Sequence, residues 1–516
     1  MRTVIRLNPG PAPSAQALSW PVVLLAAERR AWRGGPLTGI TDDSRAARPG
    51  CIFIAHRGWH ADGHAYTAAA VAAGASLVVA EQPLACAAPL CVVPDGRAAL
   101  SALADAWFGH PGRRLRLIGV TGTNGKTTTA HLIAGVLHAA GLRPCVIGTL
   151  GAQWDGQPLQ ALPWTTPPPL QLHGLLAEAV AAGADACVLE VSAQGLSQAR
   201  VADCGFEVGA LTNLSREHRE YYASEADYVQ AKAALFRRLR HAERPAHAVL
   251  NRAVPHLAAF RAACAVPVLE YGPGADIEAL SARGRGLAGS DLQLRLPGCG
   301  EPVAVRLRLP GPHNVDNALC AAAVGCALQV PPARIAAGLQ AVQEVPGRLQ
   351  HICRGPVRVL VDYAHNPAGL RALLGLLRSA TAGRLVVVMG ARGNRDPGKR
   401  PLMGAVVAAF ADRVVLTADR PAGEDAQAAA EPMRAAVADC GVPVVFCADR
   451  LRALEAALAG SRPGDCVVAV GKGPEPWEGD SETPGLDDVR ALRQLLAQER
   501  SPARRAGARA AAPHQP

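Results

Sequence analysis

Aromatic side chains are scarce in this sequence. Phe, Trp and Tyr make up 4% of the 516 residues, although hydrophobic residues reach 49% and can fill a large core with Ala, Leu and Val. Lys and Arg exceed Asp and Glu, so the formal net charge is +10. A basic chain can bind nucleic acid, but no basic stripe here is interleaved with aromatics. We therefore expect no nucleic-acid partner, and the surplus charge suits polyanionic nucleotides equally well.

Paired cysteines and long apolar runs are also missing. None of the 14 cysteines belongs to a C-x-x-C pair, which argues against a zinc site. The longest apolar stretches, such as Ala68–Ala80, are rich in Ala and Gly and are too short to cross a bilayer. The sequence starts MRTVIRLNPG, and from this start we expect no secretory leader. We therefore expect a cytoplasmic protein with reduced thiols and no membrane partner.

Length and the alternation of apolar runs predict three α/β domains and a tail. The domains cover residues 1–112, 113–343 and 344–498, and residues 499–516 are expected to be a disordered basic tail rich in Ala, Arg and Pro. Short apolar runs such as CVIGT, ACVLEVS and RLVVVMGA alternate with helical stretches, which predicts open parallel sheets covered by helices. Polar turns between Tyr271 and Pro310 predict β-hairpins.

A glycine-rich turn follows the apolar strand Leu115–Val120 and reads TGTNGKTTT up to Thr129. Its glycines let backbone N–H groups face phosphate oxygens, and the following helix adds its N-terminal dipole. Lys126 would neutralise phosphate charge, and Thr127 would offer a hydroxyl to Mg²⁺. The strict phosphate-loop pattern fails because Val120 replaces a glycine, and an ordinary strand–turn–helix junction is the alternative. The expected ATP contacts here are Gly122, Thr123, Asn124, Gly125, Lys126, Thr127 and Thr128.

The variant GTNGKTT at this turn resembles the Mur ligases and their relatives, folylpolyglutamate synthetase and the C-terminal half of cyanophycin synthetase. Further motifs match the family in the same order, and the first of them resembles its MurE branch. They are LEVSAQGLSQARV from Leu189, TNLSREH from Thr212, YVQAK from Tyr228, HNVDNA from His313, VPGR from Val345, VDYAH from Val361, GARGNRDPGKRPLM from Gly390 and GKGPE from Gly471. The resemblance implies a three-domain α/β architecture with a central phosphate-loop ATPase domain and a C-terminal Rossmann-like domain.

Three residues are expected to join Lys126 in catalysis. Glu190 ends an apolar run and His218 follows the next one, and open α/β sheets bind ligands at such carboxyl ends. Taken singly, such a Glu is usually solvated and such a His packed, and Mg²⁺ prefers the oxygen of Glu190. The resemblance implies that both hold Mg²⁺ together with Thr127. It also implies that Lys232, otherwise a solvated helix lysine, carries a carbamate that binds a second Mg²⁺.

The remaining site residues are implied by the resemblance. A uridine pocket in the first domain would use Ser44, Trp59, His60 and Ala61. The muramoyl dipeptide would contact Thr165, Thr166, Ser192, Gln198 and Arg200. Further ATP contacts would be Asn317, Arg348 and Asp362. The incoming amino acid would contact Arg395, Asp419, Arg420, Gly471 and Glu475.

Several positions depart from the family pattern. They are Trp164 in place of Asn, Ala193 and Gln194 in place of Ser and His, and Pro474 in place of His. Relatives that add diaminopimelate read D-N-P-R where this sequence reads D-R-P-A from Asp419 to Ala422. Ala422 cannot grip a distal carboxylate as that arginine does, although Arg420 could supply the charge from another direction.

The resemblance therefore implies a ligase that uses ATP and Mg²⁺ to join an amino acid, by default meso-diaminopimelate, to a UDP-linked muramoyl dipeptide in peptidoglycan synthesis. A monomer is expected. Three alternatives stay open: a paralogue with another amino acid or acceptor, a cyanophycin- or folate-type ligase, and a nucleotide-binding protein without turnover. The DSR sequence around Ser44 and the threonine pair argue against the second. The retained residues Lys126, Glu190, His218 and Lys232 argue against the third.

Overall fold

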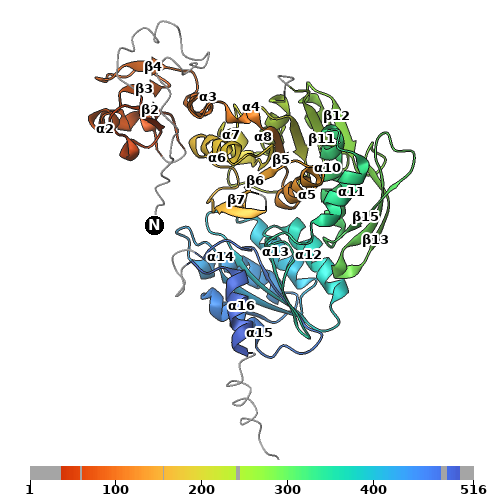
Figure 1. Ribbon diagram of the computed structural model, residues 1–516. Coiled ribbons are helices and arrows are strands. Elements are labelled where there is room, and N and C mark those ends of the chain that lie inside the picture. The colour runs from red at the N-terminus through yellow and green to blue at the C-terminus, as the bar shows by residue number, and fades with distance from the viewer. Residues whose placement is uncertain (1–36, 59–60, 155, 240–243, 478–484, 500–516) are drawn as a thin grey trace, which may run out of the picture.

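The computed structural model describes residues 37–58, 61–154, 156–239, 244–477 and 485–499. These residues form four β-sheets. Figure 1 shows a small N-terminal unit, a central unit with a hairpin sheet at its side, and a C-terminal unit below the central one. The predicted α/β fold class is confirmed by sheets of mostly parallel strands with helices around them. No helix in the described part of the chain is long and apolar enough to cross a membrane.

The N-terminal unit is built on a parallel sheet in the order β1-β2-β3-β4. Its elements are β1 (Gly39–Thr41), η1 (Ser44–Ala46), β2 (Cys51–Ala55), η2 (Gly63–Tyr66), α2 (Thr67–Ala72), β3 (Leu77–Ala80), β4 (Leu90–Val92) and α3 (Gly96–Trp107). Every residue of the apolar run in β2 is buried, as is typical of a strand covered on both faces.

The central unit is built on an eight-stranded sheet in the order β12-β11-β10-β5-β9-β6-β7-β8. The strands are β5 (Arg116–Thr121), β6 (Pro144–Gly148), β7 (Gly151–Trp154), β8 (Gln157–Gln160), β9 (Ala186–Glu190), β10 (Val208–Leu211), β11 (His247–Asn251) and β12 (Val268–Tyr271). Strand β5 pairs in parallel with both β9 and β10, whereas β7 and β8 run antiparallel. The carboxyl ends of β10, β5 and β9 therefore lie side by side, where such sheets bind ligands.

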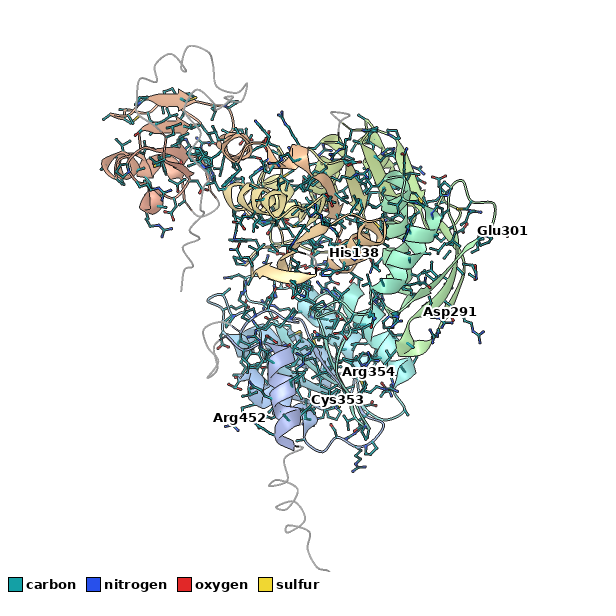
Figure 2. All side chains as sticks on the ribbon, in the orientation of Figure 1. His138, Asp291, Glu301, Cys353, Arg354 and Arg452 are labelled. Carbon is teal, nitrogen blue, oxygen red and sulfur yellow. The ribbon has the colours of Figure 1, made fainter. Side chains whose placement is uncertain are left out.

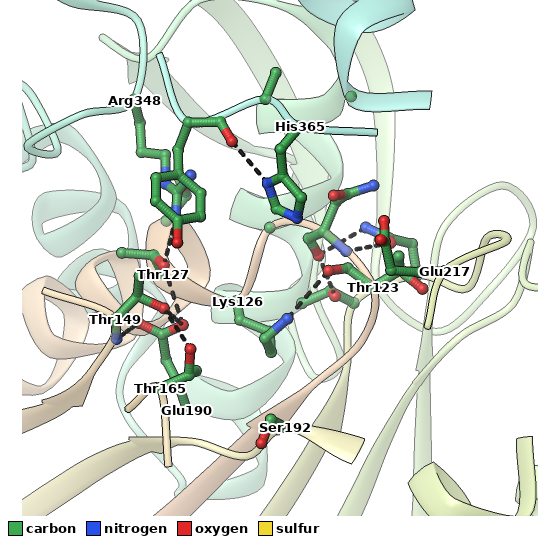
Figure 3. Close-up of a pocket in the computed structure, with 18 of the residues that line it drawn as sticks. Thr123, Lys126, Thr127, Thr149, Thr165, Glu190, Ser192, Glu217, Arg348 and His365 are labelled. Atoms are coloured by element: carbon green, nitrogen blue, oxygen red, sulfur yellow. Dashed lines mark hydrogen bonds between the residues drawn. The ribbon is translucent and has the colours of Figure 1, made fainter. Parts of the chain in front are cut away.

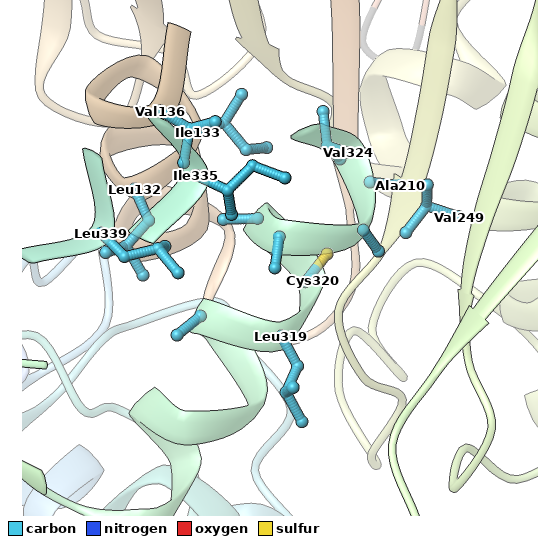
Figure 4. Packing of buried hydrophobic residues seen from close by; sticks show 14 of the residues in the cluster. Leu132, Ile133, Val136, Ala210, Val249, Leu319, Cys320, Val324, Ile335 and Leu339 are labelled. Carbon is cyan, nitrogen blue, oxygen red and sulfur yellow. The ribbon is translucent and has the colours of Figure 1, made fainter. Parts of the chain in front are cut away.

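Helices cover both faces of the central sheet. They are α4 (Pro111–Arg114), α5 (Lys126–Ala139), α6 (Pro169–Ala181), α7 (Ala193–Ser197), α8 (Glu225–Arg237), α9 (Leu257–Ala262), α10 (Pro312–Ala327) and α11 (Pro332–Ala341). Figure 4 shows the apolar side chains of α5, α10 and α11 packed together beside Ala210 and Val249 of the sheet. Helices α5 and α11 come so close that a Cβ on Gly338 would lie 2.4 Å from the Cα of Val136. This packing fixes helix α5, whose N-terminus receives the glycine-rich turn.

A separate antiparallel sheet, β13-β14-β15, confirms the hairpins predicted between Tyr271 and Pro310. Its elements are β13 (Glu278–Gly284), η3 (Gly286–Ala288), β14 (Ser290–Arg295) and β15 (Val303–Leu307). Leu292 and Leu294 of β14 are buried, whereas Figure 2 shows Asp291 and Glu301 at the outer edge of the molecule. The alternation is that of a sheet with one packed and one solvated face.

The C-terminal unit is built on a sheet in the order β16-β17-β21-β18-β19-β20, parallel except for β16. Its elements are β16 (Gln350–Arg354), β17 (Arg358–Asp362), α12 (Pro367–Ala380), β18 (Leu385–Ala391), α13 (Lys399–Ala408), β19 (Arg413–Ala418), α14 (Ala426–Ala438), β20 (Val444–Cys447), α15 (Arg450–Leu458), β21 (Cys466–Val470) and α16 (Asp488–Glu499). One face packs under α12, α13 and α14, and the other packs under α15 and α16. Residues after β17, β18, β19 and β21 face the central unit across a cavity.

Candidate active site

A cavity of about 1380 Å³ lies between the central and C-terminal units. The central unit lines it with the glycine-rich turn after β5 and with residues at the carboxyl ends of β9 and β10. The C-terminal unit contributes residues that follow β17, β18, β19 and β21. Ligand pockets usually span roughly 300–1,000 Å³, so this cavity has room for more than one substrate.

The glycine-rich turn needs its glycines for two reasons. Gly122 and Gly125 have φ angles of 145° and 82°, which disfavour residues with a Cβ. A Cβ at Gly122 would lie 1.9 Å from Thr212 Oγ1, and one at Gly125 would lie 2.3 Å from Asn317 Oδ1. Thr212 and Asn317 thus pack directly against the turn. Its backbone conformation is fixed both by this packing and by its own glycines.

Two lysines converge on the carbonyl groups of this turn. Lys126 Nζ donates to the carbonyl oxygens of Gly122 and Thr123, both at 3.0 Å. Lys232 Nζ donates to the same Gly122 oxygen at 2.8 Å and lies 4.6 Å from the centre of the Tyr228 ring. Burial lowers the pKa of both ammonium groups, and the charge of Lys126 lowers that of Lys232 further. A buried lysine with a lowered pKa is more readily a neutral nucleophile.

Glu190 is the centre of a hydroxyl network at the start of α5. This buried carboxylate accepts from Thr127 Oγ1 at 3.0 Å, and from the amide and hydroxyl of Thr149 at 3.0 and 3.2 Å. The Thr149 hydroxyl also lies 3.1 Å from that of Thr165. Figure 3 shows these side chains gathered beside Lys126 on one wall of the cavity.

The oxygens of Thr127 and Glu190 fit a magnesium ion held together with nucleotide phosphates. They lie side by side at a phosphate-binding turn, and Mg²⁺ usually takes one or two protein oxygens with phosphates and waters. The described residues contain no cluster of three His, Cys, Asp or Glu side chains that could hold a metal.

The wall expected to contact the muramoyl dipeptide is tied to Glu190 through its backbone. Thr166 Oγ1 donates to the Glu190 carbonyl at 2.9 Å and accepts from Ser192 N at 2.9 Å. Arg200 Nη1 donates to the Thr166 carbonyl at 2.6 Å, and its guanidinium lies 4.9 Å from the centre of the Trp164 ring. Gln198 is not among the residues that line the cavity, and its Oε1 accepts from Arg200 Nη2 at 2.6 Å.

Hydrogen bonds hold the side chains of two of the three further expected ATP contacts, Asn317 and Asp362. Asn317 Oδ1 accepts from Thr129 Oγ1 at 3.2 Å, and its amide donates to Asn314 at 2.9 Å. Asp362 Oδ1 and Oδ2 accept from the amides of Ala364 and Leu349 at 2.8 and 2.7 Å. Both side chains line the cavity, as does Arg348, so all three expected contacts are brought together.

Glu217 is a buried carboxylate of the central unit that faces the C-terminal unit. Its Oε1 accepts from Lys399 Nζ at 2.7 Å, while its buried Oε2 has no hydrogen-bond partner among the described residues. Burial opposes its ionisation, but the nearby His365 and Lys399 outweigh that effect and hold the pKa of Glu217 below its ordinary value. The neighbouring His218 lines the cavity, and its Nδ1 lies 3.2 Å from Glu220 Oε1.

The far end of the cavity is built around Arg392. Its guanidinium is paired with Glu475, lies 3.7 Å from Asp419 and donates to Tyr363 OH at 3.3 Å. Burial opposes ionisation of Asp419. The positive charges of Arg392, Lys472 and Arg450 outweigh burial and lower the pKa of Asp419 to about 2. Asp419 is not among the residues that line the cavity, whereas Arg392 and Glu475 are. Asp419 is therefore placed to hold Arg392 from behind.

Within the D-R-P-A stretch that replaces D-N-P-R, Arg420 lines the cavity. Arg395, another expected contact of the amino acid, lines it as well. Ala422 is exposed and has a φ angle of 51°. Gly471 is not among the lining residues, and its amide donates to the Asp362 carbonyl at 3.2 Å. A side chain at position 420 therefore reaches the cavity in this chain.

The expected uridine contacts lie away from this cavity. Ser44 begins η1 and Ala61 follows β2, both in the N-terminal unit, and neither lines the cavity. Trp59 and His60 lie outside the described residues. Most of the expected basic tail, residues 500–516, lies outside them as well.

The residues of the site that were not expected from the sequence include Thr149, Glu217 and Arg392. Thr149 and Arg392 come directly after the ends of β6 and β18, a position that marks both as candidates in an open α/β sheet. Glu217 stands beside His218 in a motif that was recognised, in place of the family's Asp.

Three family models match this chain. Residues 36–108 match the Mur ligase family, catalytic domain, residues 120–325 match the Mur ligase middle domain, and residues 347–473 match the Mur ligase, glutamate ligase domain. The three-domain architecture implied by the motifs, with the phosphate-binding turn in the central domain, is thereby confirmed.

Relatives with curated names match over nearly the whole chain. A UDP-N-acetylmuramoyl-L-alanyl-D-glutamate–2,6-diaminopimelate ligase of Geobacillus thermodenitrificans is 37% identical over 480 residues, which cover 91% of this chain and 96% of the relative. The corresponding ligase of Streptomyces coelicolor is 38% identical over 479 residues, which cover 89% and 92%. A solved structure of a ligase with that name has 30% identity and a TM-score of 0.62, and covers 90% and 96%. The chain therefore belongs to the Mur ligase family of ATP-dependent ligases, as its motifs predicted.

Proposed function

We propose that this protein joins an amino acid, by default meso-diaminopimelate, to UDP-N-acetylmuramoyl-L-alanyl-D-glutamate while ATP is converted to ADP and phosphate. The observation that carries the proposal is one cavity in which the phosphate-binding turn faces Arg392, Arg395 and Glu475. A nucleoside triphosphate and an amino acid can meet there. The names of the curated relatives support these substrates.

The proposed reaction has two steps. A carboxylate oxygen of the dipeptide attacks the γ-phosphorus of ATP, the bond to the bridging oxygen breaks, and ADP leaves. The amino group of the incoming amino acid then attacks the acyl carbon and loses a proton. The bond between the acyl carbon and the phosphate oxygen breaks, and phosphate leaves. Lys126 and Arg348 supply positive charge where phosphate charge is transferred. Binding ATP, the dipeptide and the amino acid in one cavity lowers the entropic cost of bringing the three reactants together.

Thr127 and Glu190 would hold Mg²⁺, with His218 and a carbamate on Lys232 for a second ion. Mg²⁺ supplies charge neutralisation to the phosphates when it is bound. The neutral amine favoured by burial of Lys232 is the form that can react with carbon dioxide. Thr165, Thr166, Ser192 and Arg200 would position the dipeptide carboxylate against the γ-phosphate.

The domain roles follow the same proposal. Residues 1–112 would hold the uridine nucleotide through Ser44 and Ala61, residues 113–343 would hold ATP, and residues 344–498 would hold the amino acid. A monomeric state and a cytoplasmic location remain predictions from the sequence.

A paralogue that uses a different amino acid is the second candidate. The observation that favours it is Ala422, which is small and exposed where relatives that add diaminopimelate place an arginine. Arg420 lines the cavity two positions earlier. An arginine in this motif could therefore reach a distal carboxylate only from position 420.

The test is release of phosphate and ADP from ATP and Mg²⁺ with the UDP-linked dipeptide and a panel of amino acids. We expect turnover only when all substrates are present, and none with Lys126→Ala, which removes the ammonium but keeps the fold. Equal ATP hydrolysis without the dipeptide, or full activity of Lys126→Ala, would contradict the proposal.

A further inference from the structure

One carboxylate oxygen connects the two halves of the cavity. Glu220 Oε1 lies 3.2 Å from His218 Nδ1 and accepts a hydrogen bond from Arg395 Nη1 at 3.0 Å. His218 and Arg395 line the cavity, whereas Glu220 is not among the lining residues. His218 belongs to the central unit and Arg395 to the C-terminal unit, so this oxygen spans the boundary between the two units.

The shared oxygen decides which nitrogen of His218 carries the hydrogen. Glu220 Oε1 accepts from Arg395 Nη1 at 3.0 Å, so this carboxylate is paired with a guanidinium. An ionised carboxylate only accepts, so Nδ1 of His218 must donate and the lone pair of the neutral ring lies on Nε2. A carboxylate behind an imidazole fixes the ring orientation and raises its basicity.

The backbone of His218 is held independently of its ring. Its φ angle is 57°, and its carbonyl accepts from the amides of Tyr221 and Tyr222, both at 3.0 Å. The backbone is thus held in a left-handed turn, while the ring contacts Glu220 through Nδ1 and lies 6.1 Å from the centre of the Tyr228 ring.

We propose that Glu220 is a positioning residue that couples nucleotide binding to amino-acid binding, because one oxygen holds a side chain from each half of the cavity. The proposal rests on the proposed function, since it takes His218 to face the nucleotide and Arg395 to face the amino acid. When the units dock, Arg395 reaches Glu220, and Glu220 in turn fixes His218. Coupling between two sites is reciprocal, so each ligand tightens the binding of the other by the same factor.

A second ion pair across the same boundary provides a matched control. Arg216 Nη2 lies 3.5 Å from Asp396 Oδ2 and does not line the cavity. Arg216→Gln removes a charge pair between the two units without touching the shared oxygen. If docking alone were responsible for coupling, this variant would lose it as Glu220→Ala does.

The experiment titrates a non-hydrolysable ATP analogue with Mg²⁺ into the full chain by calorimetry, with and without the amino acid, in the presence of the UDP-linked dipeptide. We expect the amino acid to tighten analogue binding by about tenfold in the unmodified protein, within the range typical of coupled sites. Glu220→Ala should abolish that factor, Glu220→Gln should retain part of it through its amide oxygen, and Arg216→Gln should keep it. Full coupling in Glu220→Ala, or equal loss in Arg216→Gln, would overturn the proposal.

A second measurement does not depend on turnover. Nitrogen-15 NMR of labelled histidine, with His218→Asn to identify the ring, should show hydrogen on Nδ1 in the unmodified protein and a shift toward Nε2 in Glu220→Ala. An unchanged tautomer would overturn the proposed contact. Should Glu220→Ala fail to fold, Glu220→Asp can replace it, because the shorter side chain moves the carboxylate oxygen away from His218 by one methylene. The same shift of hydrogen toward Nε2 is then expected. Coupled binding without any phosphate release would contradict only the proposed function.

Discussion

Arg348 of the C-terminal unit donates a hydrogen bond from Nη2 to Thr127 Oγ1 in the phosphate-binding turn, at 2.9 Å. Its guanidinium also lies 4.4 Å from the centre of the Tyr363 ring. Thr127 in turn donates to Glu190. Arg348 therefore reaches the nucleotide site of the central unit from the neighbouring unit, and it can do so only while the two units are docked.

Replacing Arg348 by Lys keeps the charge but removes the planar fork and its stacking on Tyr363. We expect the KM for ATP to rise about tenfold, equivalent to about 1.4 kcal/mol, with little change in melting temperature. Steady-state kinetics at saturating dipeptide and amino acid give the KM. Arg354→Lys is the control, because Arg354 on β16 is exposed (labelled in Figure 2) and is not among the residues that line the cavity. An unchanged KM in Arg348→Lys would show that the contact does not serve the nucleotide.

Lys232 is expected to carry a carbamate. Lys232→Ala should be nearly inactive, and bicarbonate or a short carboxylate should restore part of the activity because it replaces the missing oxygens. Lys232→Arg should be equally inactive, since it keeps a charge and cannot be carbamylated. Carbon-13 NMR of active protein in labelled bicarbonate should show the carbamate carbon, and a free amine in such a sample would refute the modification.

The amino-acid specificity is predicted to depend on positions 420 and 422. A missing bidentate contact between arginine and carboxylate should cost about 2–4 kcal/mol, or roughly thirtyfold to several-hundredfold in affinity. We expect Ala422→Arg to raise kcat/KM for meso-diaminopimelate relative to lysine and smaller amino acids. Arg420→Gln should lower it if Arg420 compensates. A micromolar KM for diaminopimelate that Ala422→Arg leaves unchanged would contradict this interpretation.

A buried ion pair joins α15 to α16. Arg450 donates to Asp488 at 2.6 and 2.7 Å, and the Trp477 indole donates to the same carboxylate at 3.0 Å. Asp488→Ala leaves the Arg450 charge buried and unpaired, so we expect a loss of about 3–5 kcal/mol of stability. The exposed pair Arg434–Glu431 is the control, where Glu431→Ala should cost less than about 1 kcal/mol. Scanning calorimetry compares the two, and similar melting temperatures would be the contrary result.

Asp419 predicts a pH dependence of stability. Burial raises its pKa, but Arg392 and Lys472 outweigh burial and lower it to about 2 from an ordinary 3.8. A carboxyl with a lowered pKa in the folded state contributes stability above its unfolded pKa and loses it as the pH falls toward the folded value. Stability should therefore decline from about pH 4.5 to pH 2, and more gently in Asp419→Asn. Identical acid slopes in denaturant unfolding would contradict the assignment.

Local elements of the fold could be predicted from the sequence because their determinants are close in the chain. The apolar run RLVVVMGA became the buried strand β18, and the run Leu115–Val120 became β5 with its bounds shifted by one residue. The turn-rich stretch after Tyr271 became a hairpin sheet. Periodic burial and turn residues act over a few positions, so one sequence suffices to read them.

The sequence by itself also determined the phosphate-binding turn, since its glycines, Lys126 and Thr127 are contiguous. The tertiary structure alone decided which distant residues complete the site. Thr149 meets Glu190 across 41 positions, Arg395 meets Glu220 across 175, and Arg348 meets Thr127 across 221. Such contacts depend on how the sheets pack and how the units dock, and these are fixed by buried area and charge complementarity summed over the whole chain. No local pattern carries that information.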